Sequence, residues 1–81
     1  MRTFILCSLL CLVTTDLWAD FDSATQAYQQ RDYVTAFAEF SILAETGDPR
    51  AQTILALMHR FGEGTTEDLN EAFNWYSRAA T

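Results

Sequence analysis

Few side chains in this sequence have the chemistry of a catalytic or metal-binding site. His59 is the single histidine among 81 residues, and a general base or a metal ligand needs further groups around it. The stretch Gly62-Glu63-Gly64 has the glycines of a phosphate loop but lacks the lysine and the preceding strand. We therefore interpret His59 as a packing residue and the two glycines as a turn. The sequence predicts no catalytic residue, no cofactor and no bound metal.

Two other groups have a chemical and a structural interpretation. Trp75 and Tyr76 could stack on a ligand, but an aromatic pair in a helix more often belongs to a core. Glu67, Asp68 and Glu71 could contribute to a calcium site, which would need more oxygen ligands in a loop. The start of a helix also favours acidic residues because of its dipole. We therefore expect both groups to be structural.

The first 19 residues have the pattern of a secretory signal peptide. Arg2 supplies a positive charge, residues 4–13 are apolar or small, and Leu17-Trp18-Ala19 ends in a small residue suited to cleavage. The apolar run is shorter than the ~20 residues that a membrane-spanning helix needs. We expect cleavage after Ala19 and a periplasmic or secreted product. An uncleaved membrane anchor is the alternative.

Cleavage would leave a small acidic chain, residues 20–81. Both cysteines, Cys7 and Cys11, would leave with the signal peptide, so no disulfide is expected. The signal peptide also contains one arginine and one aspartate, so the net charge stays at −6. An acidic chain without a basic cluster argues against binding to nucleic acid or to an anionic membrane. A chain of this length makes one small domain at most.

Apolar residues recur at helical spacing after the signal peptide, and no segment shows the alternation of a strand. We expect four helices, over residues 23–31, 33–46, 49–61 and 66–81. The expected N-terminal caps are Asp22 or Ser23 for the first helix, Asp32 for the second and Asp48 for the third. Asp20 and Asp22 are otherwise expected to lie in a solvated N-terminal tail.

A sequence offset of 36 residues relates two parts of the chain. The first set of positions is Asp32, Ala36, Phe40, Leu43 and Ala44. Counted 36 residues further on, the corresponding positions are, in the same order, Asp68, Ala72, Tyr76, Ala79 and Ala80. A fixed offset of this size indicates a helical repeat. The predicted fold is therefore all-α, with two antiparallel helical hairpins stacked as a short α/α solenoid.

The second copy resembles the Sel1-like repeat, a relative of the tetratricopeptide repeat. The matching positions are Ala51, Leu55, Gly62, Gly64, Asp68, Ala72, Trp75, Tyr76, Arg78, Ala79 and Ala80. The sequence departs from the family pattern at Ala56, His59, Thr65 and Glu71. Residues 20–48 resemble the degenerate tetratricopeptide-like hairpin that often precedes such repeats. The resemblance thus divides the chain into a signal peptide (1–19), this hairpin (20–48) and a Sel1-like repeat (49–81).

The resemblance implies an exported module for protein–protein interaction, an adaptor or scaffold rather than an enzyme. In tetratricopeptide proteins the first helix of each pair lines a groove for a peptide or protein. The corresponding positions here are Phe21, Thr25, Tyr28, Gln29, Arg50, Thr53, Leu57 and Arg60. Arg50 and Arg60 could bind a carboxylate of the partner by paired hydrogen bonds; surface arginines that are simply solvated are the alternative.

Other interpretations stay open at this point. The chain could be a truncated fragment or an assembly subunit of a longer repeat array. A remote alternative is the binding or hydrolysis of β-lactams, which the resemblance suggests only for cysteine-rich members of the family. Leu69, Phe73, Tyr76 and Ala80 are spaced to form one apolar stripe. We expect this stripe to be exposed and to drive association, either with a partner or as a homo-oligomer.

Overall fold

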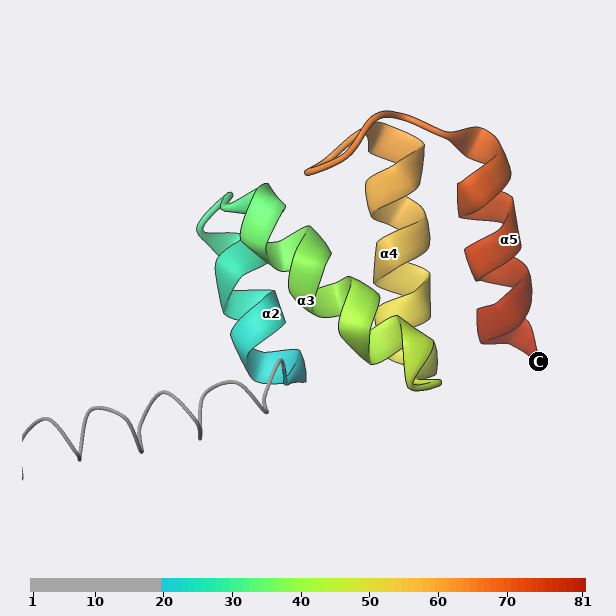
Figure 1. The fold of residues 1–81 in the computed structure, drawn as a ribbon, viewed down its shortest axis with the longest axis horizontal. Helices are drawn as coiled ribbons and strands as arrows, with labels where there is room; N and C mark the ends of the chain where they lie inside the picture. Colours follow the sequence, from blue (N-terminus) through green and yellow to red (C-terminus); the bar gives the residue numbers. More distant parts are fainter. Residues whose placement is uncertain (1–19) are drawn as a thin grey trace, which may run out of the picture.

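The computed structural model describes residues 20–81, and all the regular structure in this range is helical (Figure 1). The helices are α2 (Phe21–Gln29), α3 (Tyr33–Glu45), α4 (Pro49–Phe61) and α5 (Leu69–Ala80). The predicted all-α class is confirmed. None of these helices has the length and apolar character needed to cross a bilayer. The predicted signal peptide, with Cys7 and Cys11, lies outside the described residues.

Each helix packs against the next one along the chain. Helix α2 packs on α3, α3 on α4 and α4 on α5. Helices α4 and α5 run antiparallel, side by side, and α3 lies between α2 and α4 (Figure 1). This order of contacts is the order that two successive helical hairpins produce. Helix α3 is therefore the element that connects the first pair of helices to the second.

An aspartate caps the N-terminus of every described helix. The carboxylates of Asp32 and Asp48 accept hydrogen bonds from the amides of Thr35 (3.3 Å) and Arg50 (2.9 Å), as the sequence predicted. Pro49 occupies the first turn of α4, where its missing amide hydrogen is not needed. Gly62 ends α4 in the left-handed conformation, with φ of 69°. The predicted bounds of the third helix are confirmed.

The first and last helices begin at residues other than those predicted. Asp20 accepts a hydrogen bond from the amide of Ser23 at 2.7 Å, so Asp20 is the cap of α2 and not part of a solvated tail. The prediction of Asp22 or Ser23 as the cap was wrong, and the predicted helix over residues 23–31 lies two residues earlier in the structure. Helix α5 begins at Leu69 and not at residue 66 or 67, because Asp68 accepts bonds from the amides of Asn70 and Glu71 in its first turn.

The core is built from small residues that let the helices approach, together with a few large ones. Its buried members are Ala24, Ala36, Phe40, Ala44, Ala51, Leu55, Ala56, Met58 and Trp75. Alanine at a helix contact allows a short distance between helix axes. Phe40 fills the space between α2 and α3, where its ring lies edge-on to Phe21 at 5.7 Å. The buried amide of Gln52 donates to the carbonyl of Ala44 at 3.0 Å and so connects α4 to the end of α3.

The loop between α4 and α5 lies against the beginning of α3 (Figure 1). Gly64 has φ of 76°, and a Cβ atom there would overlap the carbonyl of Tyr33. Only glycine allows this approach between two backbones. The predicted turn at Gly62-Glu63-Gly64 is confirmed, and it contributes a contact between the two helical pairs.

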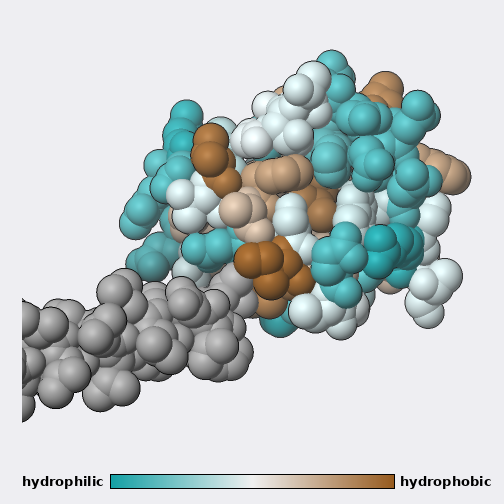
Figure 2. Space-filling view, in the orientation of Figure 1, coloured by the Kyte–Doolittle hydropathy of each residue, from teal (hydrophilic) through white to brown (hydrophobic). Residues whose placement is uncertain are grey.

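Among residues 20–81, five large apolar side chains remain exposed, namely Val34, Ile42, Phe61, Leu69 and Phe73. On the face of the molecule seen in Figure 2, the hydrophobic surface forms separate patches between hydrophilic ones. The first two of these residues belong to α3, and the last two belong to α5. Helices α3 and α5 therefore carry most of the large apolar side chains that the described chain leaves uncovered.

Candidate partner-binding face

One side of α4 carries four of the residues predicted to bind a partner. Arg50, Thr53, Leu57 and Arg60 recur at intervals of three and four, so they share one side of the helix. Leu57 is half-buried, and the other three are exposed. The hydroxyl of Thr53 donates to the carbonyl of Pro49 at 3.0 Å, within its own helix. This side of α4 is accessible, and it combines basic, polar and apolar groups.

Helix α2 supplies the other four predicted residues, which are placed less uniformly. Phe21, Thr25 and Tyr28 are half-buried, and Gln29 is exposed. Thr25 and Gln29 face an open depression of about 480 Å³, whose lining is completed by Asp20, Asp22, Ser23 and Gln26. Because this depression is open to solvent, it lacks the enclosing walls of a small-molecule site.

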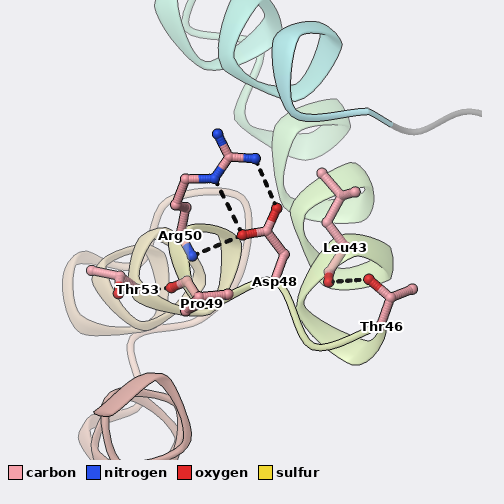
Figure 3. A network of polar contacts seen from close by, with 6 residues as sticks. All are labelled: Leu43, Thr46, Asp48, Pro49, Arg50 and Thr53. Atoms are coloured by element: carbon pink, nitrogen blue, oxygen red, sulfur yellow. Dashed lines mark hydrogen bonds and ion pairs between the residues drawn. The ribbon is translucent and has the colours of Figure 1, made fainter. Parts of the chain in front are cut away.

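A contact between Arg50 and Phe21 brings the two sets of residues together. The guanidinium carbon of Arg50 lies 4.0 Å from the centre of the Phe21 ring, the distance of a cation–π interaction. Asp48 also binds this guanidinium (Figure 3), with Arg50 Nε donating to Oδ1 at 3.3 Å and Nη2 to Oδ2 at 3.1 Å. Arg50 is thus fixed between the beginning of α2 and the cap of α4.

The Asp48–Arg50 pair changes what Arg50 can offer to a partner. The hydrogen bond from the Arg50 side chain, supported by backbone amides, holds the pKa of the Asp48 carboxyl below its usual value of 3.8. The carboxylate therefore stays ionised at neutral pH and neutralises the charge of Arg50. The arginine side chain is still 66% exposed. A partner could pack on the exposed face of the guanidinium group. Two of its nitrogens, Nε and Nη2, already donate to Asp48, and these donors are not available to a carboxylate of the partner.

Arg60 differs from Arg50 in this respect. Its guanidinium carbon lies 5.3 Å from the centre of the Phe61 ring, and it forms no ion pair with residues 20–81. Arg60 is exposed near the end of α4. Of the two arginines proposed to bind a carboxylate, Arg60 is the one whose charge is available for that role.

Tyr28 is engaged within the fold. Its hydroxyl donates to Glu63 Oε1 at 2.6 Å, and its ring lies 5.1 Å from that of Tyr33. The hydrogen bond to Glu63, together with burial, raises the pKa of Tyr28 to about 12. Tyr28 thereby ties α2 to the loop between α4 and α5. No local pattern in the sequence indicated this pair, because its members are 35 positions apart.

His59 has the surroundings of a packing residue. It is half-buried, and its ring lies edge-on to Phe37 at 5.3 Å. Its Nδ1 atom is buried and has no hydrogen-bond partner among the described residues. Residues 20–81 contain no group of three His, Cys, Asp or Glu side chains that could hold a metal ion. The ring contact with Phe37 is a sufficient reason for an aromatic side chain at position 59, so no catalytic or metal-binding role is needed to explain it.

Comparison with known proteins identifies the second half of the described chain. Residues 49–81 match the family model of the Sel1 repeat. No curated protein and no solved structure matches the chain. The matched residues are α4, the glycine loop and α5, which are the elements that carry the accessible arginines and the loop contact described above. Sel1 repeats are generally modules for protein–protein interaction. The helical pair α4–α5 is therefore similar to a Sel1 repeat, a helical hairpin of the tetratricopeptide-like kind.

Proposed function

We propose that this protein is an exported adaptor or scaffold that binds another protein and catalyses no reaction. The observation that carries the proposal is the accessible side of α4 within the Sel1 repeat. The repeat gives the general role of interaction, and this side of α4 offers the surface. The fixed contact between Arg50 and Phe21 extends the surface toward α2.

The charges on this surface suggest the chemistry of the bound segment. The chain has a net charge of −6, so most of its charged side chains would repel an acidic partner. An arginine without a paired carboxylate is a site where a carboxylate of the partner could bind. Arg60 would bind a carboxylate of the partner, and the half-buried Leu57, one turn earlier on the same side, would contact an apolar side chain. A segment of a partner protein with an acidic and an apolar residue in close sequence fits this arrangement.

Exchange of one charge on this surface tests the proposal. A partner captured from the periplasm is identified first, and its affinity is then measured for Arg60→Glu and for Arg31→Glu. Both positions are exposed arginines, and both changes alter the net charge by the same amount, but Arg31 lies in the α2–α3 turn, away from α4. We expect Arg60→Glu to weaken binding and Arg31→Glu to leave it nearly unchanged. Equal weakening by both variants would contradict a specific role of this side of α4.

The export of the protein is supported by the sequence of residues 1–19. The intact mass of the protein from the periplasmic fraction tests it. We expect a species that begins at Asp20. A species that retains Met1 and fractionates with the membrane would replace the proposed soluble adaptor with an anchored one.

A further inference from the structure

Helix α5 presents an apolar stripe on the flank next to its buried side, which is formed by Ala72 and Trp75. Its members are Leu69, Phe73, Tyr76 and Ala80, spaced by four, three and four positions. Leu69 is 62% exposed and Phe73 is 70% exposed, and Ala80 is also exposed. Helix α5 is the outermost helix in Figure 1, with α4 on one side and no described element on the other. The expected exposure of this stripe is confirmed for Leu69, Phe73 and Ala80, whereas Tyr76 is half-buried.

The corresponding stripe of α3 is covered by its neighbours. The offset of 36 residues relates the α5 stripe to Tyr33, Phe37, Phe40 and Ala44. Phe40 and Ala44 are buried. The ring of Phe37 packs against His59, and the ring of Tyr33 lies 5.1 Å from that of Tyr28. The same register of residues therefore forms a helix–helix interface in the first pair and lies open in the second.

The open stripe is free of charged residues. Helix α5 contains two of them, Glu71 and Arg78, and the helical period places both well away from the stripe. The guanidinium carbon of Arg78 lies 4.1 Å from the centre of the Trp75 ring. Its Nη2 atom lies 4.0 Å from a carboxylate oxygen of Glu45 in α3. The polar residues beside the stripe, Asn70, Asn74 and Ser77, are uncharged.

An uncharged face on an acidic protein suits one kind of partner. A different protein is usually steered and selected by complementary charge, and this face offers none. Two copies of a chain with a net charge of −6 repel each other least where the meeting faces are neutral. The neutral stripe of α5 is such a face.

The order of residues along the stripe is also suited to self-association. Leu69 and Ala80 are equidistant from its midpoint, and so are Phe73 and Tyr76. We propose that α5 packs antiparallel against α5 of a second copy of this chain. Leu69 then faces Ala80 of the second copy, and Phe73 faces its Tyr76, in an interface with twofold symmetry. A helix of 12 residues is only about 18 Å long. The dimer is therefore weak, with a dissociation constant in the roughly micromolar to millimolar range.

Analytical ultracentrifugation over a concentration series tests the dimer. The sample is the protein purified as its host cell processes it. We expect the average mass to rise toward that of a dimer with concentration. Phe73→Glu should weaken association at least tenfold, the change that corresponds to about 1.4 kcal/mol. The matched control is Val34→Glu, since Val34 on α3 is similarly exposed, at 74%. It should leave association unchanged. Both substitutions are at exposed positions, and circular dichroism checks that both variants stay helical.

A mixture of two further variants tests the antiparallel register. Leu69→Glu places a negative charge at the start of α5 and Ala80→Lys places a positive charge at its end, and both are compatible with the helix dipole. Native mass spectrometry of the mixture should show more heterodimer than random mixing gives, because the new carboxylate of one variant would face the new ammonium group of the other. Random mixing would overturn the register. A monomer at all concentrations, or equal loss in Phe73→Glu and Val34→Glu, would overturn the proposal.

Discussion

The two helical pairs of this chain follow one plan and differ in what covers their second helix. In both pairs an aspartate caps that helix, Asp32 in α3 and Asp68 in α5. In both pairs an alanine four positions later is buried, Ala36 and Ala72. These shared residues set where the helix begins and how closely it approaches its partner helix.

The pairs diverge further along the same helix. Phe40 is 1% exposed, whereas its counterpart Tyr76 is half-buried. Ala44 is buried, whereas its counterpart Ala80 is not. The difference follows from the neighbours, because α3 packs between α2 and α4, whereas α5 packs mainly on α4. An apolar repeat pattern thus indicates a surface suited to packing, and the next element decides whether that surface is buried.

The largest difference in the free energy of unfolding should come from replacing the two counterpart aromatic residues, Phe40 and Tyr76. Phe40→Ala should lower the free energy of unfolding by about 3–5 kcal/mol, because it leaves a cavity between α2 and α3. Tyr76→Ala should cost only about 1–2 kcal/mol, since its ring is only partly removed from water. Urea denaturation measures both. Equal losses would contradict the difference in burial.

The next effect concerns the loop that joins the pairs. Gly64→Ala should cost more than about 2 kcal/mol, because the new methyl group would overlap the carbonyl of Tyr33 at positive φ. Gly47 also has a positive φ, of 103°, but a Cβ atom there would meet no other atom within 4 Å. Gly47→Ala should therefore be milder. Thermal unfolding of the two variants makes the comparison, and a milder effect at Gly64 would contradict the close loop contact.

The buried alanines should behave alike in the two pairs. Ala36→Leu and Ala72→Leu should each cost about 1–3 kcal/mol, because a larger side chain would force the helices of each hairpin apart. Denaturant titration of the two variants measures the cost. A harmless substitution at either position would show that this pair of helices is not held close by its alanine.

A smaller effect is expected at the hydrogen bond between the pairs. Tyr28→Phe should cost about 1 kcal/mol at neutral pH, because Glu63 loses its partner. The pKa of Tyr28 is raised from 10.0 to about 12, so this contribution is present below pH 10 and is lost as the pH rises toward 12.

Stability measured against pH in the alkaline range detects this contribution. The difference in unfolding free energy between the wild type and Tyr28→Phe should shrink as the pH rises from 10 to 12. Tyr33→Phe is the control, since Tyr33 contacts Tyr28 through its ring. A difference that stays constant over this pH range would show that the Tyr28 hydroxyl does not hold the loop.

The sequence predicted those features of the fold that depend on neighbouring residues. The caps Asp32 and Asp48 and the end of α4 at Gly62 require only local geometry, and they were predicted correctly. Asp20, Asp22 and Ser23 are all good caps, and their spacing did not identify the one in use. The start of α5 is set by the Asp68 cap, and the amide of Asp68 itself donates a longer-range bond to the His59 carbonyl at 2.7 Å. Propensity alone therefore placed it too early.

In the candidate site, too, the features set by neighbouring residues could be predicted, whereas the contacts between distant residues could not. The shared side of Arg50, Thr53, Leu57 and Arg60 follows from helical spacing, so the sequence could predict it. The contacts of Arg50 with Phe21, and of Tyr28 with Glu63, depend on how α2, α4 and the loop meet. No local signal encodes those meetings, so they had to come from the structure.

Hydroxyl-radical footprinting with mass spectrometry tests most directly the claim that one stripe is covered and its counterpart is open. The experiment uses dilute protein, so that self-association does not protect α5. The oxidation rates of Phe37 and Phe73 are read in one sample, since the two are counterparts 36 positions apart. We predict that Phe73, which is 70% exposed, is oxidised much faster than the half-buried Phe37. Equal protection of the two rings would contradict the account, because it would mean that the chain itself covers the apolar stripe of α5.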